Sequence, residues 1–347
     1  MRDDAARAAH LLAPKGMDRA AVLGAGSWGT ALAIHLSGVG HDVVLWGRDQ
    51  GLIAEMATRR ANPTYLPDLA FPDLLSVSPE LSVALADVRY VIIAVPSHGL
   101  RALLRQAVPY LPPGAILVSA TKGLEADTLM SMSQVMQQET RGLHPVIVLS
   151  GPSFAAEVAR GLPTALVAAS HNDIAVQCVQ EEFRSGAFRL YHSDDVAGVE
   201  IGAALKNVIA IAAGMVQSME LGHNAMAALI TRGLAEMSRL AFAMGGRRET
   251  LSGLSGLGDL VLTCTGGLSR NRHVGMELGR GRSLKDILAS MKMVAEGVRT
   301  TSVALALART HGIELPIVAK MQEVLEGQRS PREAVADLMG RPQRSEH

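Results

Sequence analysis

Cysteine is scarce in this sequence, and neither sign of charge predominates. Only Cys178 and Cys264 occur among 347 residues, too few to hold together a secreted scaffold of this size and not spaced as metal ligands. Basic and acidic residues number 33 each, so no global field would draw the protein to nucleic acid or to an anionic membrane. We therefore predict a cytoplasmic protein without a nucleic-acid partner, in which local clusters of side chains hold any anion.

The sequence also lacks the signals of a metal site, of secretion and of a membrane span. Its 11 histidines include no paired ligand motif such as HExxH, so we predict no metal. Residues 1–16 carry mixed charge without a long apolar run, which indicates a flexible tail, with Met17 as an alternative start. Ala20 to Gly40 has no charged residue over about the length of a membrane span, but its five glycines and its change from a strand pattern to a helix pattern exclude a transmembrane segment.

Length and apolar content predict two domains. Of the 347 residues 48% are hydrophobic, enough for a large core. From Asp194 onward apolar residues recur at helical spacing, which predicts an all-α domain at residues 193–347. Before it, residues 17–192 contain six short apolar runs separated by segments with helical character. This is typical of a doubly wound parallel sheet covered on both faces. The runs are Ala20 to Leu23, Asp42 to Trp46, Arg89 to Val95, Ala115 to Ser119, Val146 to Leu149 and Thr164 to Ala169.

A glycine-rich turn follows the first of these runs. Gly24, Gly26 and Gly29 form a GxGxxG pattern between the run and a helix. In that setting the first glycine permits the turn, the second leaves room for a pyrophosphate and the third lets helix and strand pack closely. The helix N-terminus then offers its free N–H groups to the phosphates. The pattern predicts a dinucleotide site lined by Ser27 and Trp28. A turn without a ligand is the alternative.

The end of the second apolar run bears on the choice between NADH and NADPH. An acidic residue at that place bonds the ribose 2′-hydroxyl of NAD, and a basic one accepts the 2′-phosphate of NADP. Arg48 comes 19 residues after Gly29, where its guanidinium could grip a phosphate. Asp49 beside it keeps NAD open, and a solvated Arg-Asp pair is the third interpretation. We predict that NADPH is favoured.

Two polar segments directly follow predicted strands. Ligands of open α/β sheets bind at the carboxyl ends of the strands, so Lys122 in the segment SATKGLE is expected to point into the cleft. A surface lysine is the alternative. In LSGPSFA, Gly151 and Ser153 can offer backbone and hydroxyl hydrogen bonds to a ligand. Simple helix capping by these residues is the competing interpretation.

A lysine interrupts an otherwise apolar helix face in the second half of the chain. Lys206 shares that face with Ala203 and Ile209, and burial there would lower its pKa and suit it to proton transfer near neutral pH. A lysine whose amine reaches the surface is the alternative. The glycine-dense stretch SGLSGLGD is expected to leave Asp259 on a loop of close backbone approach, where its carboxylate could pair with Lys206. A plain Asx turn competes with that interpretation.

The segment SRNR concentrates hydrogen-bond donors. Ser269, Arg270 and Asn271 precede a further arginine, Arg272, and such a group suits a phosphate dianion. A solvated basic surface is the alternative for this cluster taken alone.

Taken together, these motifs resemble those of bacterial NAD(P)-dependent glycerol-3-phosphate dehydrogenases. The resemblance runs from about Asp18 to Met339, and the leader before Met17 has no counterpart in it. One stretch departs from the pattern at His223 and Met226, which puts local helix or substrate contacts in doubt. The matching segments, in order, are GAGSWGTALA, LWGRD, NPTYLP, TKGLE, LSGPSFAAEV, GAALKNVIAIAAG, AALITRGLAEM, GLSGLGDL, SRNR and VAEGV.

The resemblance implies a Rossmann-like domain followed by a helical substrate domain, usually in a homodimer. It implies interconversion of dihydroxyacetone phosphate and sn-glycerol 3-phosphate by hydride transfer with NADPH or NADH, which supplies glycerol 3-phosphate for phospholipid synthesis. Lys206 would donate and accept the proton beside Asp259. The implied substrate contacts are Lys122, Gly151, Ser153, Lys206, Asp259, Ser269, Arg270 and Asn271. The implied cofactor contacts are Gly24, Gly26, Ser27, Trp28, Gly29, Arg48, Tyr65, Lys122, Ala155, Arg270, Val294 and Glu296.

Two other functions remain open at this point. A β-hydroxyacid dehydrogenase or a ketopantoate reductase would also combine a dinucleotide domain, a helical domain and a cleft lysine. Their substrates carry a carboxylate, so SRNR and GLGDL argue against them, and an activity panel would decide. A catalytically silent NAD(P)-sensing protein could use the same fold as a binding module, and it would bind dinucleotide without turnover.

Overall fold

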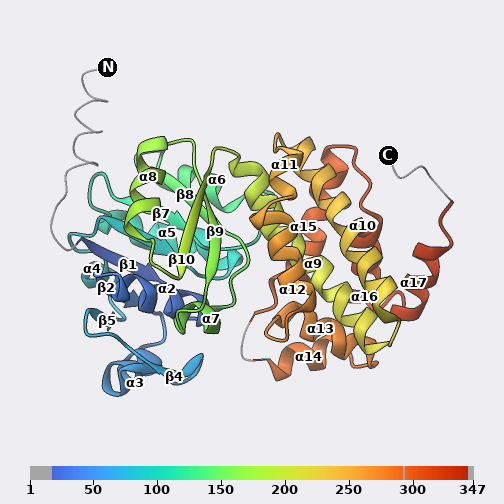
Figure 1. Ribbon diagram of the computed structural model, residues 1–347, viewed down its shortest axis with the longest axis horizontal. Coiled ribbons are helices and arrows are strands. Elements are labelled where there is room, and N and C mark those ends of the chain that lie inside the picture. Colours follow the sequence, from blue (N-terminus) through green and yellow to red (C-terminus); the bar gives the residue numbers. More distant parts are fainter. Residues whose placement is uncertain (1–17, 292–293, 343–347) are drawn as a thin grey trace.

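The structure is a computed structural model that describes residues 18–291 and 294–342. The predicted tail at residues 1–16 and the alternative start at Met17 lie outside the described residues. Figure 1 shows a sheet with flanking helices in the first half of the chain and a bundle of helices in the second half. The predicted fold class, a Rossmann-like sheet followed by a helical part, is confirmed.

Eight strands form one sheet in the order β10-β9-β8-β7-β6-β1-β2-β5, and β3 and β4 form a separate antiparallel pair. All six predicted apolar runs supply strands of the large sheet. The strand order reverses at β1, which lies between β2 and β6. The strands are β1 (Arg19–Leu23), β2 (Asp42–Trp46), β3 (Ala61–Asn62), β4 (Leu66–Ala70), β5 (Leu75–Ser78), β6 (Tyr90–Ile93), β7 (Ile116–Ser119), β8 (Val146–Ser150), β9 (Thr164–Ala169) and β10 (Phe188–Ser193).

The prediction of a wholly parallel sheet is wrong at one pair of strands. β9 runs antiparallel to β8, with Leu149 opposite Ala168, and β10 then runs parallel to β9. The outer strands β5 and β10 were not among the predicted runs. Each lies at an edge of the sheet, and β10 alternates buried and exposed residues along FRLYHS. An edge strand needs only one apolar face, so it lacks the continuous apolar run that marks a central parallel strand.

Helices cover both faces of the large sheet. One face packs against α2, α3, α7 and α8, and the other against α4, α5 and α6. The central strands are therefore buried on both sides, as their apolar sequences require. The helices of this half are α2 (Ser27–Gly38), α3 (Gln50–Arg59), α4 (Leu81–Ala84), α5 (Leu100–Ala107), α6 (Met132–Glu139), α7 (Ala155–Ala159) and α8 (Asp173–Glu182), with short 3-10 turns at Ser97–Gly99 and Val108–Tyr110.

The second half is built around α9 (Val196–Ser218), which packs against α10, α12, α13 and α15. By length and composition α9 could cross a membrane, but its apolar window is entirely buried, which marks it as the core helix of this half. The division into domains at residues 192 and 193 stays a prediction; β10 ends at Ser193. The other helices are α10 (Gly222–Ala243), α11 (Arg248–Leu251), α12 (Asp259–Thr265), α13 (Arg270–Gly279), α14 (Leu284–Ser290), α15 (Glu296–Thr310), α16 (Pro316–Leu325) and α17 (Pro331–Met339).

Candidate active site

Lys206 lies in the middle of α9 with its amine among buried groups. The residue is 6% exposed, so the alternative of an amine that reaches the surface is wrong. Its Nζ donates to Oδ1 of Asp259 at 2.5 Å and to Oγ1 of Thr263 at 2.9 Å. An ammonium has three N–H bonds, and these two partners accept two of them.

Asp259 is the first residue of α12, and the prediction that it lies on a loop is wrong. The glycine-rich stretch before it, Leu254–Gly258, forms a π-helical turn that leads directly into α12. The predicted close backbone approach is present. A Cβ on Gly256 would lie 2.1 Å from the carbonyl oxygen of Leu251, and one on Gly202 of α9 would lie 2.7 Å from that of Ser255. The glycines thus bring this turn against α9, and Asp259 faces Lys206.

Residues after β7 and β8 approach the same carboxylate from the sheet. Nζ of Lys122 donates to Oδ2 of Asp259 at 2.8 Å and to the carbonyl oxygen of Gly151 at 3.1 Å. The hydroxyl of Ser153 donates to that carbonyl oxygen at 3.0 Å. Lys122 is therefore not an isolated surface lysine. Ser153 does not cap α7, because Phe154 holds the capping position without a side-chain hydrogen bond.

The contacts among these groups shift the pKa values of Lys206 and Asp259. Burial, together with the charge of Lys122, lowers the pKa of Lys206 to about 8, although Asp259 acts in the opposite direction. Burial by itself would raise the pKa of Asp259, but Lys122 and Lys206 together hold it below its ordinary value. The arrangement provides an anchored carboxylate and an ammonium that can lose its proton near neutral pH.

The SRNR segment lies close to this group because α13 packs tightly on α9. A Cβ on Gly275 would lie 1.8 Å from the carbonyl oxygen of Ile211, so the two helix backbones touch. Ser269 caps α13 by accepting from the N–H of Arg272 at 3.2 Å. The side chain of Asn271 donates to Oδ1 of Asn207 at 2.9 Å, next to Lys206 in sequence.

Arg270 is the first residue of α13. The residue is exposed, but the protein atoms around its guanidinium lower the pKa of that group, and the charges of Glu296 and Tyr65 act in the opposite direction. Arg270 is therefore close enough to Glu296 and Tyr65 for their charges to affect its pKa, and all three residues were predicted to contact the cofactor. In the part of the chain that the structure describes, Ala155 and Val294 have no polar contact with the lysines; Ala155 begins α7 and packs on the core of the sheet.

The glycine-rich turn between β1 and α2 has the shape that a pyrophosphate needs. Gly24 has a φ of +125°, and a Cβ on Gly29 would lie 1.9 Å from the carbonyl oxygen of Gly24. A Cβ on Gly26 would meet nothing within 4 Å, so the space above this residue is open. Helix α2 begins at Ser27 without a side-chain cap or an acidic residue in its first turn. These features fit an anionic ligand at the helix N-terminus.

Arg48 and Asp49 follow β2 at the same edge of the sheet. The Asp49 carboxylate caps α3 by accepting from the N–H of Leu52 at 3.0 Å. Arg48 is exposed, and its side chain makes no hydrogen bond or ion pair within residues 18–291 and 294–342. Arg48 and Asp49 form no ion pair with each other in this part of the chain, and a ligand contact by Arg48 stays a prediction beside the alternative of two solvated side chains.

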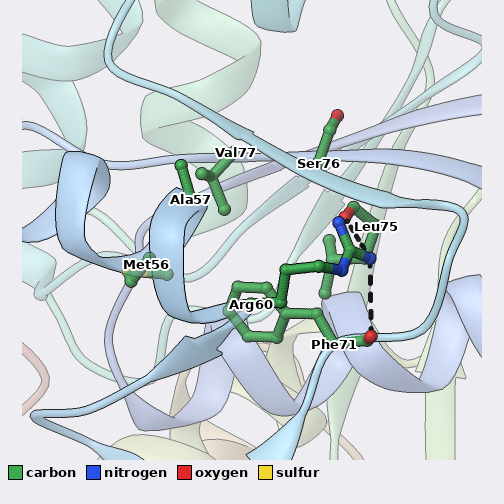
Figure 2. A pocket seen from close by; sticks show the side chains of 7 residues that line it. All are labelled: Met56, Ala57, Arg60, Phe71, Leu75, Ser76 and Val77. Atoms are coloured by element: carbon green, nitrogen blue, oxygen red, sulfur yellow. Dashed lines mark hydrogen bonds between the residues drawn. The ribbon is translucent and has the colours of Figure 1, made fainter.

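A small pocket lies apart from these groups, between α3 and β5. Figure 2 shows Arg60 reaching the carbonyl oxygens of Phe71 and Leu75, to which it donates at 3.4 Å each. It also donates to the carbonyl oxygen of Pro72 at 2.7 Å, so Nη2 of Arg60 is surrounded by backbone carbonyl oxygens. The pocket contains no predicted site residue and is lined by Met56, Ala57, Arg60, Phe71, Leu75, Ser76 and Val77.

Sequence reasoning missed three polar residues of the site. Thr263 follows Asp259 by four positions, so helical spacing puts both on one face of α12, and this signal was available. Asn207 adjoins Lys206 but was not singled out. Ser97 donates its N–H and its hydroxyl to Glu296, 199 positions away, and nothing local in the sequence indicates that contact.

The chain matches two models of a known family along nearly its whole length. Residues 19–176 match the model described as NAD-dependent glycerol-3-phosphate dehydrogenase N-terminus, and residues 195–336 match the corresponding C-terminus. A relative from Koribacter versatilis, named glycerol-3-phosphate dehydrogenase [NAD(P)+], is 51% identical over 334 residues, which cover 95% of this chain and 99% of the relative. One from Syntrophotalea carbinolica with the same name is 52% identical over 328 residues, covering 94% and 98%.

Solved structures show the same likeness. The crystal structure of glycerol-3-phosphate dehydrogenase from Coxiella burnetii is 40% identical, with a TM-score of 0.90, and the alignment covers 93% of this chain and 99% of that one. A ketopantoate reductase from Ralstonia eutropha is 15% identical with a TM-score of 0.57 over 92% of this chain and 100% of that one, a likeness of fold alone.

Proposed function

The chain belongs to the family of NAD-dependent glycerol-3-phosphate dehydrogenases, and we propose that Lys206 moves the proton in the reaction of this family. The enzyme interconverts dihydroxyacetone phosphate and sn-glycerol 3-phosphate with NADH or NADPH. The bound cofactor supplies a hydride to the carbonyl carbon. The carbonyl oxygen must gain a proton at the same time, so that ketone, hydride and proton give the secondary alcohol.

The surroundings of the Lys206 amine carry this proposal. Asp259 and Thr263 accept two of its N–H bonds, at 2.5 and 2.9 Å, and the third can point at the substrate oxygen. With a pKa of about 8, the ammonium can give up a proton near neutral pH and recover it in the reverse direction. Positioned acid catalysis of this kind is worth roughly a hundred- to ten-thousand-fold in rate.

Lys122 and Asp259 are proposed to hold the reacting end of the substrate. Asp259 fixes both amines by one oxygen each, at 2.8 and 2.5 Å. Lys122 uses two N–H bonds for Asp259 and Gly151, which leaves one for a substrate oxygen. A positive charge on either side of the carbonyl stabilises the oxyanion as it develops.

The substrate phosphate is proposed to bind at the start of α13. Arg270 and the N-terminus of this ten-residue helix both present positive charge there. Gly151 and Ser153 would complete the substrate contacts from the sheet, with Ser269 and Asn271 ordering the start of α13. Binding the phosphate away from the reacting carbon would hold the ketone in place, so dihydroxyacetone without phosphate should lose turnover as well as affinity.

The cofactor is proposed to lie along the carboxyl ends of the strands, from the turn after β1 toward Lys122. Gly24, Gly26 and Gly29 leave the room for its pyrophosphate, with Ser27 and Trp28 beside it. Tyr65, Ala155, Val294 and Glu296 are proposed further contacts, carried over from the family pattern. Since Asp49 already caps α3 and Arg48 has no partner among the described residues, we propose that Arg48 donates to a 2′-phosphate and that NADPH is preferred.

We further propose that the enzyme works in the cytoplasm as a homodimer and supplies glycerol 3-phosphate for phospholipid synthesis. These proposals rest on the family and on the low cysteine content. Gel filtration with light scattering tests the dimer. Depletion of the protein followed by measurement of phospholipid synthesis tests its supply role.

The catalytic role of Lys206 is tested by Lys206→Ala, measured by NADPH oxidation with dihydroxyacetone phosphate. The expected result is a loss of turnover of at least about a hundredfold with unchanged NADPH binding. Lys320→Ala is the control, because Lys320 is also a lysine paired with carboxylates, those of Glu323 and Asp337, but it lies in α16, where no site residue was predicted. Retention of most activity by Lys206→Ala would overturn the assignment.

A further inference from the structure

A hydroxyl and a carboxylate join the two halves of the chain beside the cleft. Ser97 lies in the turn after β6, and Glu296 is the first residue of α15. The N–H of Ser97 donates to Oε1 of Glu296 at 3.0 Å, and its hydroxyl donates to Oε2 at 2.7 Å. Both oxygens of one carboxylate are thus held by one residue, which fixes the plane of the carboxylate.

The loop that carries Lys122 closes against this pair. A Cβ on Gly123 would lie 2.7 Å from Cβ of Ser97 and 3.4 Å from Oε2 of Glu296. No larger residue fits at this position without moving the pair, and Gly123 has a φ of +152°. Three segments therefore meet at one point: the turn after β6, the loop after β7 and the start of α15.

The place where these three segments meet is the part of the sheet at which ligands of such folds bind. The strand order reverses between β1 and β6, and ligands of such sheets bind in the crevice outside the carboxyl ends at that place. The glycine turn after β1 packs on the end of β6, because a Cβ on Gly24 would lie 2.6 Å from the carbonyl oxygen of Ala94. A dinucleotide held by that turn would lie along the end of β6 on the way to Lys122, where Ser97 and Glu296 could contact it.

We propose that Ser97 is a positioning residue for the nicotinamide half of the cofactor and acts through Glu296. The inference rests on the proposed cofactor path. A carboxylate has about four acceptor positions, of which Ser97 fills two, and the others can accept N–H bonds from the carboxamide of the nicotinamide ring. With the carboxylate already held in place, little side-chain entropy is lost when the ring binds.

A second hydroxyl–carboxylate pair supplies a matched control. Ser133 of α6 donates its N–H at 2.8 Å and its hydroxyl at 2.6 Å to the carboxylate of Glu200 in α9. This pair also joins the sheet half to the helical half, with the same donor groups and similar distances. It is fully buried, with Glu200 5% and Ser133 4% exposed, so it offers no acceptor to a ligand.

The experiment compares Ser97→Ala with Ser133→Ala. Dissociation constants for NADPH come from its fluorescence without substrate, KM values from NADPH oxidation, and melting temperatures from thermal unfolding. We expect Ser97→Ala to weaken NADPH binding and raise its KM roughly tenfold, with the KM of dihydroxyacetone phosphate unchanged. Ser133→Ala should lower the melting temperature and leave NADPH binding unchanged.

A double-mutant cycle with Glu296→Ala tests whether Ser97 acts through Glu296. The double variant should bind NADPH as weakly as Glu296→Ala alone, because the carboxylate that Ser97 positions is already gone. Additive losses would overturn the proposal, and so would a Ser97→Ala variant that only melts earlier. Binding without substrate does not depend on the proton donor, so a failure here is distinct from a failure of the role of Lys206.

Discussion

Lys122 and Lys206 bind the two opposite oxygens of a single buried carboxylate, that of Asp259. The distances are 2.8 Å from Lys122 and 2.5 Å from Lys206. One lysine comes from the loop after β7 and the other from the core helix of the second half, so Asp259 connects the two halves at the proposed active site. The pKa values of Lys206 and Asp259 depend on each other, and this gives the first two predictions.

The rate should depend on pH with opposite signs in the two directions. In the proposed mechanism reduction uses protonated Lys206, whose pKa is lowered to about 8 mainly by burial, so its rate should fall as the pH rises through about 8. Oxidation requires the neutral amine, so its rate should rise over the same interval. The measurement is kcat in each direction from pH 6 to pH 10. Profiles of the same sign in both directions would rule out Lys206 as the proton carrier.

Asp259→Asn should lower both activity and stability. It leaves two amines in the site without their counter-ion, which for a buried pair costs about 3–5 kcal/mol of unfolding free energy. The pKa of Lys206 should fall further, because Asp259 raises it, and kcat of reduction at neutral pH should drop about a hundredfold.

Asp195→Asn is the control for that variant. Asp195 is also buried, but it caps α9 and accepts from the N–H of Gly198 at 2.8 Å. The Asp195→Asn variant should be less stable than the wild type but should keep the same kcat per folded molecule. If both variants lost kcat equally, the role of Asp259 would be structural only.

Two glycine variants should separate folding from cofactor binding at the turn after β1. A Cβ on Gly29 would lie 1.9 Å from the carbonyl oxygen of Gly24, so Gly29→Ala should destabilise the turn and lower the melting temperature. A Cβ on Gly26 would meet nothing within 4 Å of protein, so Gly26→Ala should fold normally and yet obstruct the pyrophosphate. Thermal unfolding and NADPH fluorescence measure the two effects. Normal NADPH binding by Gly26→Ala would place the phosphates elsewhere.

Arg48→Ala should weaken the use of NADPH and leave that of NADH nearly unchanged. An arginine–phosphate contact contributes to NADPH binding alone, and its loss should raise KM for NADPH roughly tenfold. Arg59→Ala is the control. Arg59 is exposed, as Arg48 is, but it lies at the end of α3 and pairs with Glu55 at 2.9 Å. The two KM values are read from parallel assays. Equal changes with both cofactors would contradict a 2′-phosphate contact.

Glu236 should make the stability fall as the pH rises toward neutral. Burial raises its pKa to about 7, although the N–H groups of Ile317 and Val318 act in the opposite direction. A carboxyl with a raised folded-state pKa stabilises the fold fully below its ordinary value of 4.5, and this contribution is lost as the pH rises through about 7. Urea unfolding at pH 5 and pH 8 measures the change.

Glu236→Gln should remove this part of the pH dependence, because an amide does not titrate. The difference in unfolding free energy between the wild type and the variant should therefore change between pH 5 and pH 8. A constant difference would mean that Glu236 does not titrate in this range. KM for both substrates should stay unchanged, since Glu236 contacts the start of α16 and no predicted site residue.

The sequence by itself determined the central strands, the nucleotide turn and the candidate lysines. The runs that became β1, β2, β6, β7, β8 and β9 are apolar because both faces of the central sheet are covered, and this leaves a continuous local signal. The glycine turn could be predicted because Gly24 adopts a positive φ and Gly29 approaches the backbone closely, both within one βαβ unit. Lys206 could be singled out because one charge interrupts an apolar helix face.

Only the tertiary structure decided the edge strands, the direction of β9 and the contacts between distant residues. β5 and β10 bury one face each, so their sequences resemble those of loops, and strand direction depends on how the chain connects rather than on its local pattern. Asp259 follows glycines that predict a loop, but packing against Gly202 of α9 turns them into a helical turn. The contact of Ser97 with Glu296 spans 199 positions, and hydrogen bonds over such separations arise only when both halves have folded against each other.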